Sequence, residues 1–231
     1  MEKKKIYVTA HAGCMNTKRD SLESIVAGIN AGANIVEVDI RFMNNCIPIL
    51  SHDKFKFKIR KHIIRLEEVL KIVKEFNNIK INLDIKEIEG IVYLKELLYK
   101  TGMNNRVFLT GISYDLVGQV LEKHIDIPYF LNIDLNLFNR ISKDYIIEQI
   151  KMIDNLNVLG INIDYHFVTP KLVEDIHNVN KKLSVWTVDN IKDIFRMIEY
   201  GVDNITTNKV DLVAEILKEK NLYLDSNSTQ E

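Results

Sequence analysis

Short β-branched runs alternate with longer amphipathic stretches along almost the whole chain, and this alternation most constrains the fold. The predicted strands span residues 6–10, 34–40, 80–85, 106–111, 127–133, 158–163, 183–188 and 203–207. The predicted helices span residues 21–32, 66–76, 93–102, 114–123, 144–154, 171–181, 191–201 and 210–220. Several of these carry apolar residues at i, i+3, i+4 and i+7, which is the spacing of an amphipathic helix.

Strands that alternate with helices pair in parallel through right-handed crossovers. Eight strands with eight helices favour closure into a (β/α)8 TIM barrel. A doubly wound open sheet is the alternative, because periodicity does not reveal whether a sheet closes on itself.

The chain is predicted to form one domain, residues 1–221, followed by a flexible tail, residues 222–231. Its 231 residues fall within the usual length of a single barrel, and no linker rich in proline, glycine or serine interrupts it. The polar end DSNSTQE is typical of a disordered terminus.

An extra apolar run, residues 47–50, follows the second strand after a turn-like MNNC. It predicts a hairpin arm, or a strand continued across a bend, and not a ninth barrel strand.

Charge and hydropathy exclude several classes of protein. The net charge of −1 argues against bulk binding of nucleic acid or of an anionic membrane. No stretch approaches the roughly 18 apolar residues that cross a bilayer. The two cysteines, Cys14 and Cys46, make no disulfide framework, so we expect a cytoplasmic protein.

Polar side chains gather where the first strands end: His11, Glu37, Asp39, His52, Asp84 and Lys86. The carboxyl ends of barrel strands form the active-site face, so these groups can converge. Glu37 and Asp39 are two apart on one strand and point to the same side. Two such acids repel each other unless a cation or a proton intervenes. Carboxylate oxygens without a cysteine ligand suit Mg²⁺ or Ca²⁺ better than zinc.

The run HAGCMNTKRDSLESIVAGINAGANIVEVDIRFMNNCIPILSHD resembles the opening of the glycerophosphodiester phosphodiesterases. Their pattern is His-Arg-Gly, Glu-Asn-Thr before a helix, Gly-Ala-Asp followed by Glu-x-Asp, and then His-Asp. Further on, INLDIK resembles the family's acid-x-Lys strand, and LSVWTVDN with IEYGVDNITTN resembles its last elements. The resemblance extends from about Tyr7 to Asn208.

The resemblance implies a barrel of the PLC-like phosphodiesterase type whose partner is a small-molecule phosphodiester. It implies a metal-dependent phosphodiesterase that hydrolyses glycerophosphodiesters to glycerol 3-phosphate and an alcohol. It places the divalent metal, Mg²⁺ or Ca²⁺, on Glu37, Asp39 and Asp84, and it makes Lys86 a cation beside the substrate phosphate. It makes His11 and His52 the acid–base pair. We expect His11 to be the base and His52 the acid, although the sequence does not fix that order.

Several residues depart from the family pattern. The arginine that follows the first histidine, a phosphate contact, is Ala12 here. Losing a charge-assisted contact should cost about 1.5–3 kcal/mol unless another cation replaces it. Lys18, Arg19 and Arg41 are candidates, and Arg41 and Arg19 are favoured. Trp186, the only tryptophan, is either a core residue or a wall of the substrate site.

Two other functions remain open. One is a related phospholipase D or phospholipase C activity on lysophospholipids, which would use the same metal and histidines. The other is a catalytically silent barrel that binds a phosphate ligand or a partner protein, as the missing arginine suggests. The retention of both histidines and three mutually repelling acids argues against the silent barrel.

Overall fold

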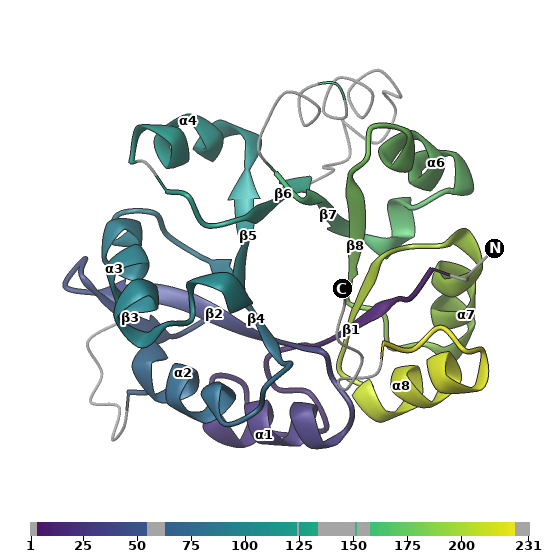
Figure 1. The fold of residues 1–231 in the computed structure, drawn as a ribbon, viewed down its shortest axis with the longest axis horizontal. Coiled ribbons are helices and arrows are strands. Elements are labelled where there is room, and N and C mark those ends of the chain that lie inside the picture. The colour runs from purple at the N-terminus through teal and green to yellow at the C-terminus, as the bar shows by residue number, and fades with distance from the viewer. Residues whose placement is uncertain (1–3, 55–62, 124, 134–150, 152–157, 225–231) are drawn as a thin grey trace.

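The structure is a computed structural model that describes residues 4–54, 63–123, 125–133, 151 and 158–224. Eight parallel strands close into a barrel, in the order β1-β9-β8-β7-β6-β5-β4-β2, and β1 pairs with β2 to complete the ring (Figure 1). They are β1 (Tyr7–Ala10), β2 (Ile35–Met43), β4 (Lys80–Ile85), β5 (Val107–Ser113), β6 (Tyr129–Ile133), β7 (Gly160–Asp164), β8 (Lys182–Trp186) and β9 (Asn204–Thr207). The predicted barrel is therefore confirmed over the open sheet.

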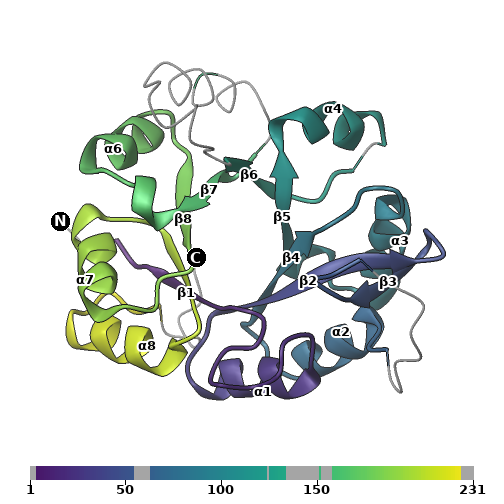
Figure 2. The same cartoon turned by 180° about the vertical axis from the view of Figure 1, so that it is seen from behind.

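Helices surround the ring of strands on its outside, as Figures 1 and 2 show from opposite ends. They are α1 (Leu22–Asn30), α2 (Leu66–Lys74), α3 (Ile91–Thr101), α4 (Tyr114–Glu122), α6 (Pro170–Asn178), α7 (Ile191–Tyr200) and α8 (Val210–Glu219). Short 3₁₀ turns cover Asn104–Arg106 and Tyr165–Phe167. Of the helix predicted at residues 144–154, only Lys151 is described. None of the described helices combines the length and apolar character needed to span a bilayer.

Residues 47–50 form β3 (Ile47–Leu50), which pairs antiparallel with the far end of β2. This agrees with the predicted hairpin arm. Because β2 has nine residues, its first part belongs to the barrel wall and its last part belongs to the hairpin. The turn that follows β3 is tied back to the strand, since the Ser51 N–H donates to the Asp39 carbonyl at 3.0 Å.

The two faces of the barrel wall differ in polarity. Along β2 the buried apolar residues Val36, Val38 and Ile40 alternate with the acids Glu37 and Asp39. Since successive side chains leave a strand on opposite faces, the apolar set packs under the helices and the acids face the barrel interior. Other buried polar residues on the strands are Thr9, Asn82, Thr110, Asn162, Ser184, Asn204 and Thr206. The core thus lies mainly between strands and helices.

The end of the described chain packs onto the barrel. The Ile6 N–H donates to the Leu222 carbonyl at 2.9 Å, and Tyr223 bridges to Ile6 as a parallel partner. The Asn34 side chain donates to the Leu224 carbonyl at 2.9 Å. The first three residues of the predicted tail are therefore bound to the barrel, and residues 225–231 lie outside the described residues.

Candidate active site

A cavity of about 590 Å³ lies among residues at the carboxyl ends of the barrel strands. Every predicted site residue except Arg41 lines it: His11, Arg19, Glu37, Asp39, His52, Asp84, Lys86 and Trp186. Their side chains come from loops and strands that are up to about 175 positions apart in the sequence. The fold thus brings the candidate residues together, and the role of each remains a prediction.

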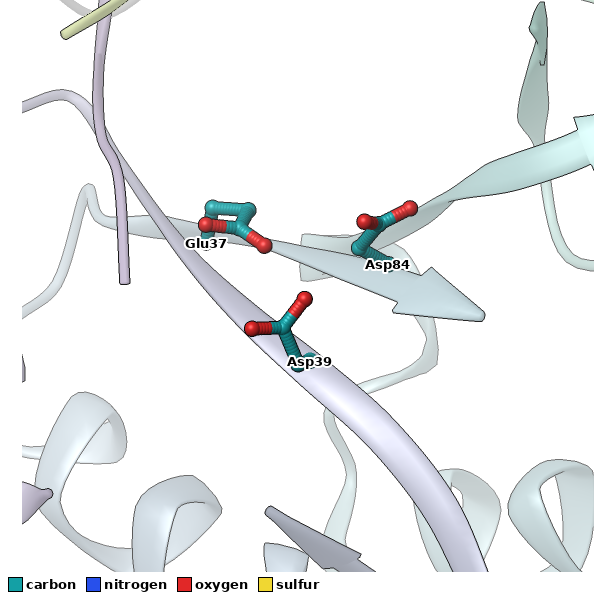
Figure 3. A group of neighbouring side chains, drawn as sticks. All are labelled: Glu37, Asp39 and Asp84. Carbon is teal, nitrogen blue, oxygen red and sulfur yellow. The ribbon is translucent and has the colours of Figure 1, made fainter. Parts of the chain in front are cut away.

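Three carboxylates converge in this cavity. Asp39 on β2 stands opposite Asp84 in the register of the neighbouring parallel strand β4. Glu37 lies two residues before Asp39 on the same face of β2. One oxygen from each carboxylate lies within 4.8 Å of the other two. Figure 3 shows the three side chains turned toward one another from these two strands.

Burial makes this arrangement electrostatically costly. Glu37 is 6% exposed and Asp39 is 3% exposed, so bulk water does not screen their repulsion. Burial raises the pKa of Glu37 well above its usual value, and the charges of Asp39 and Asp84 raise it further. The backbone N–H of Ala12 opposes this shift, since it donates to Glu37 Oε2 at 2.7 Å.

Lys86 partly neutralises the three acids. Its Nζ lies 2.9 Å from Asp39 Oδ1 and also forms an ion pair with Asp84. Burial on its own would lower the pKa of Lys86, but Asp84 and Asp39 together outweigh burial and the pKa is raised. The ammonium group therefore stays charged between the two aspartates.

A divalent cation fits this donor set. If an ion bound here and kept all three carboxylates ionised, the acids and Lys86 would together carry a formal charge of −2, which one divalent ion would balance. Asp39 Oδ2 is buried and has no hydrogen-bond partner among the described residues, so its lone pairs are free for another ligand. Hard oxygen donors of this kind suit Mg²⁺ or Ca²⁺.

Two residues of β5 hold Asp84 in place. The Thr110 hydroxyl lies 3.1 Å from Asp84 Oδ1. Gly111 has a φ of +77°, and a Cβ there would lie 2.3 Å from the Ile85 carbonyl and 2.7 Å from Asp84 Oδ1. Only glycine therefore permits this close approach of β5 to the Asp84 carboxylate.

His11 follows β1, and its backbone N–H donates to the Thr207 carbonyl at the end of β9. Its Nδ1 lies 3.1 Å from Asn208 Oδ1, and Asn208 is in turn bonded to Asp189. Burial lowers the pKa of His11, the Asn208 hydrogen bond opposes that effect, and Arg19 reinforces it. A neutral His11 is therefore favoured at neutral pH.

His52 stands on the turn after β3, with an exposed side chain whose Nδ1 lies 3.0 Å from Asp53 Oδ1. Its backbone is held from both sides. Its N–H donates to Asp20 Oδ2 at 3.2 Å, and its carbonyl accepts from Arg41 Nε at 3.1 Å. The peptide groups thus fix the position of His52, while its ring keeps access to the cavity.

Arg41 does not line the cavity, in contrast to its predicted role as a phosphate contact. Its guanidinium pairs with Glu87 at 2.8 Å, and the same carboxylate accepts from the Phe42 N–H. Although Arg41 lies two residues after Asp39, β2 has by then left the barrel wall for the hairpin with β3. The side chain therefore supports the turn that carries His52.

Arg19 lies in the loop before α1 and lines the cavity. Ala12, at the position of the family arginine, is buried, and its N–H is bonded to Glu37. Of the two favoured replacements for that arginine, Arg19 alone reaches the cavity wall.

Several polar residues of the site were not predicted from the sequence. Asn82, Thr110, Asn162, Thr187 and Thr206 line the cavity, and so does Asn132 near the end of β6. Their signal in the sequence is a polar residue at alternate positions of otherwise apolar strands, as in KINLDI, YFLNI and GINID. Asp189 and Asn208 were missed because they come together only through two loops that follow different strands. Trp186 proves to be a cavity wall, and its Nε1 is buried without a partner among the described residues.

Comparison with known proteins points to one family. A model of the glycerophosphoryl diester phosphodiesterase family matches residues 55–212. A glycerophosphodiester phosphodiesterase from Caldanaerobacter subterraneus subsp. tengcongensis is 21% identical over 240 residues, which cover 93% of this chain and 98% of that protein.

Solved structures share the barrel. A glycerophosphodiester phosphodiesterase from Parabacteroides distasonis superposes with a TM-score of 0.76 at 19% identity, over 95% of this chain and 99% of the other. A phosphodiesterase from Oleispira antarctica, solved in complex with the product sn-glycerol-3-phosphate, gives a TM-score of 0.74 at 17% identity, over 92% and 96% of the chains. At this level of identity the likeness concerns the fold.

Proposed function

The chain belongs to the glycerophosphoryl diester phosphodiesterase family of phosphoric diester hydrolases, and we propose that it hydrolyses glycerophosphodiesters to glycerol 3-phosphate and an alcohol with a divalent metal ion. The observation that carries the proposal is the buried carboxylate cluster, with the unpartnered Asp39 Oδ2, in a cavity that both His11 and His52 line. The product bound to the Oleispira antarctica protein supports this class of substrate.

Glu37, Asp39 and Asp84 would hold the metal ion. When bound, the ion supplies positive charge beside the phosphoryl oxygens. The ammonium group of Lys86 reduces the electrostatic repulsion between Asp39 and Asp84, and it adds a positive charge beside the substrate phosphate. Arg19 supplies a second cation at the cavity wall, in place of the arginine that the family has at position 12.

The two histidines divide the proton transfers. His11 removes the proton from the attacking hydroxyl, which belongs either to the glycerol next to the phosphate or to water. As the oxygen attacks phosphorus, the bond from phosphorus to the alcohol oxygen breaks, and His52 donates a proton to that oxygen. Attack by water gives glycerol 3-phosphate directly. Attack by the glycerol hydroxyl gives a cyclic phosphodiester, which a water molecule then opens to glycerol 3-phosphate, with His52 taking the proton of the water and His11 returning a proton to the glycerol oxygen. Histidine suits both steps, because its unperturbed pKa of about 6.5 allows one ring to be neutral and another charged near neutral pH.

The lining favours a small polar diester over a lysophospholipid. Among the described residues that line the cavity, Ile85 and Trp186 are the apolar side chains, and the others are polar, charged or glycine. An acyl chain needs a continuous apolar wall, which these residues do not provide.

Both cysteines are free thiols, which supports the cytoplasmic setting that we propose.

The test is an assay of metal-depleted protein on glycerophosphocholine, glycerophosphoethanolamine and lysophosphatidylcholine, with Mg²⁺ or Ca²⁺ added back. We expect hydrolysis of the glycerophosphodiesters only after metal is restored, and none by Asp39→Asn. Activity that survives exhaustive chelation would rule out the metal role. Phosphate binding without turnover of any diester would support the silent barrel, and faster turnover of the lysolipid would support the phospholipase.

A further inference from the structure

We infer that Asp189 and Asn208 fix the tautomer of His11, so that Nδ1 carries the hydrogen and Nε2 is the bare nitrogen that faces the substrate. In the proposed function, on which this inference rests, His11 is then the proton acceptor and His52 the donor. The hydrogen bonds of Asp189 determine the orientation of the Asn208 amide and, through it, the position of the hydrogen on His11.

Two donors other than the Asn208 side chain hold Asp189 as an acceptor. Oδ1 accepts from the backbone N–H of Asn208 at 2.7 Å and from the Thr207 hydroxyl at 3.0 Å. The Lys209 N–H donates to that same hydroxyl oxygen at 2.9 Å, which leaves the hydroxyl hydrogen directed at Asp189. An aspartate is ionised at neutral pH, and an ionised carboxylate only accepts hydrogen bonds.

The amide of Asn208 therefore has one possible orientation. Its side chain lies 2.8 Å from Asp189 Oδ2, so the atom there must be the nitrogen, because an amide oxygen would face a carboxylate oxygen. The amide oxygen then faces His11 Nδ1 at 3.1 Å. An oxygen can only accept, so the hydrogen in this bond must belong to Nδ1.

This arrangement leaves His11 Nε2 free for chemistry. Nε2 has no hydrogen-bond partner among the described residues, on a ring that lines the cavity. Burial lowers the pKa of His11, as does Arg19, whereas the Asn208 bond, Asp39 and Asp189 raise it, and the net direction is downward. A neutral ring with a hydrogen on Nδ1 has its lone pair on Nε2, which is the requirement for a base. Asp189 and Asn208 are thus positioning residues, since neither lines the cavity.

Nuclear magnetic resonance tests the tautomer without any assay of turnover. Long-range ¹H–¹⁵N spectra of the full-length protein with ¹⁵N-labelled histidine distinguish protonated from bare ring nitrogens. The signals that disappear in His11→Gln belong to His11. At alkaline pH we expect a protonated Nδ1 and a bare Nε2. A hydrogen on Nε2, or an even mixture of tautomers, would overturn the inference. If the wild-type protein hydrolyses no diester, the proposed function fails while these spectra still decide the tautomer.

Asn208→Ala tests the role of the pair in turnover. Without the amide oxygen the two tautomers mix, and we expect kcat to fall at least about tenfold while KM changes less than about threefold. Loss of the orienting carboxylate in a serine protease triad lowers kcat about 10⁴-fold for the same reason. The matched control is Asn178→Ala, an exposed asparagine at the end of α6, which should retain full activity. An unchanged tautomer in Asn208→Ala, or equal effects on KM and kcat, would indicate a merely structural role.

Exchanging the two side chains gives a rescue experiment. Asn208→Asp alone places two carboxylates against each other, and Asp189→Asn alone leaves the Asn208 amide free to turn over. In the double variant the amide at position 189 can donate to the carboxylate at position 208, which can again accept from His11 Nδ1. We expect at least about tenfold recovery of kcat over Asn208→Asp, with the acidic limb of kcat/KM moved to higher pH by the new charge. A double variant no better than the single ones would refute the inference.

Discussion

Asp39 and Asp84 stand opposite each other on neighbouring parallel strands, each an acid in the interior of the barrel. An ion pair with Lys86 relieves part of their repulsion, but Asp39 Oδ2 remains buried and without a partner among the described residues. Such an oxygen costs free energy in the metal-depleted protein.

Metal binding should stabilise the fold more strongly as pH rises. The pKa of Glu37 is raised, so the stability associated with its protonated form is present at low pH and is lost as pH rises through the folded-state pKa. We expect added Mg²⁺ or Ca²⁺, at roughly 100 times Kd, to raise Tm by about 5 to 10 °C at mildly alkaline pH. At acidic pH, where Glu37 holds its proton, the shift should be smaller. Differential scanning calorimetry of chelated and metal-loaded protein measures both.

Asp39→Asn is the control for that experiment, because it removes one charge without a change of size. The chelated variant should be more stable than the chelated parent, and added metal should leave its Tm nearly unchanged. A metal-dependent Tm shift that persists in Asp39→Asn would mean that the ion binds elsewhere.

Gly111→Ala should damage both the fold and the metal site. Its positive φ and the contacts of a new Cβ with Ile85 and Asp84 predict a loss of about 2 to 4 kcal/mol in the free energy of unfolding. Gly118→Ala on α4 is the matched control, since no described residue outside the glycine's own helical turn has an atom within 4 Å of a Cβ placed there. It should gain about 0.5 to 1 kcal/mol, as glycine does when replaced by alanine in a helix. Urea unfolding of both variants decides the comparison.

Arg19→Ala should raise KM for a glycerophosphodiester by about 10- to 100-fold, which corresponds to the loss of one charge-assisted contact to phosphate. Lys18→Ala makes the same change of charge one position earlier, on a residue that does not line the cavity, and its KM should change less than about twofold. Equal effects of the two substitutions on KM would mean that Arg19 acts through long-range electrostatic attraction and not through a direct contact with the substrate phosphate.

Arg41→Ala should lower kcat about tenfold with little effect on KM, because the guanidinium holds the carbonyl of His52 and the acid His52 acts late in the reaction. It should also cost about 2 kcal/mol of stability, since Glu87 loses its partner. Arg41→Lys should not restore kcat, as an ammonium group lacks the planar fork that reaches both partners. A rise in KM at unchanged kcat would instead make Arg41 the phosphate contact that the sequence suggested.

The acidic limb of kcat/KM should lie below pH 6.5, the ordinary pKa of histidine. Burial lowers the pKa of His11, so the ring keeps its lone pair to a lower pH than a free imidazole does. A bound metal ion would offset the charge of Asp39, one of the groups that raise this pKa, and so move the limb lower still. A profile measured at saturating metal tests this, and a limb above pH 6.5 would contradict it.

Local sequence patterns predict much of this fold and its acids, for physical reasons. Alternation of strands and helices allows few architectures, so the barrel follows from periodicity and chirality. The two-residue repeat of a strand places Glu37 and Asp39 on one face. Their meeting with Asp84 depends on the register between β2 and β4, which no single strand encodes.

Other contacts of the site could not be predicted in this way. The two-residue repeat also put Arg41 on the face of the acids, but it does not reveal that β2 leaves the barrel wall after residue 40. Asp189 and Asn208 are 19 positions apart and meet only because β8 and β9 are neighbours in the closed ring. Contacts that depend on the path of the chain between distant residues can be identified only from the three-dimensional structure.

The β2–β3 hairpin has a consequence for how the protein opens. Two of the proposed metal ligands, Glu37 and Asp39, and the turn that carries His52 belong to one contiguous segment, residues 35–53, closed by the bond from the Ser51 N–H to the Asp39 carbonyl. Local unfolding of this segment would remove the proposed ligands Glu37 and Asp39 and the proposed proton donor His52 at the same time. Its amides should therefore exchange with solvent deuterium as a single group, and that group should exchange more slowly when the ion is bound. The fraction of molecules that are able to catalyse the reaction is then set by the local folding equilibrium of this hairpin.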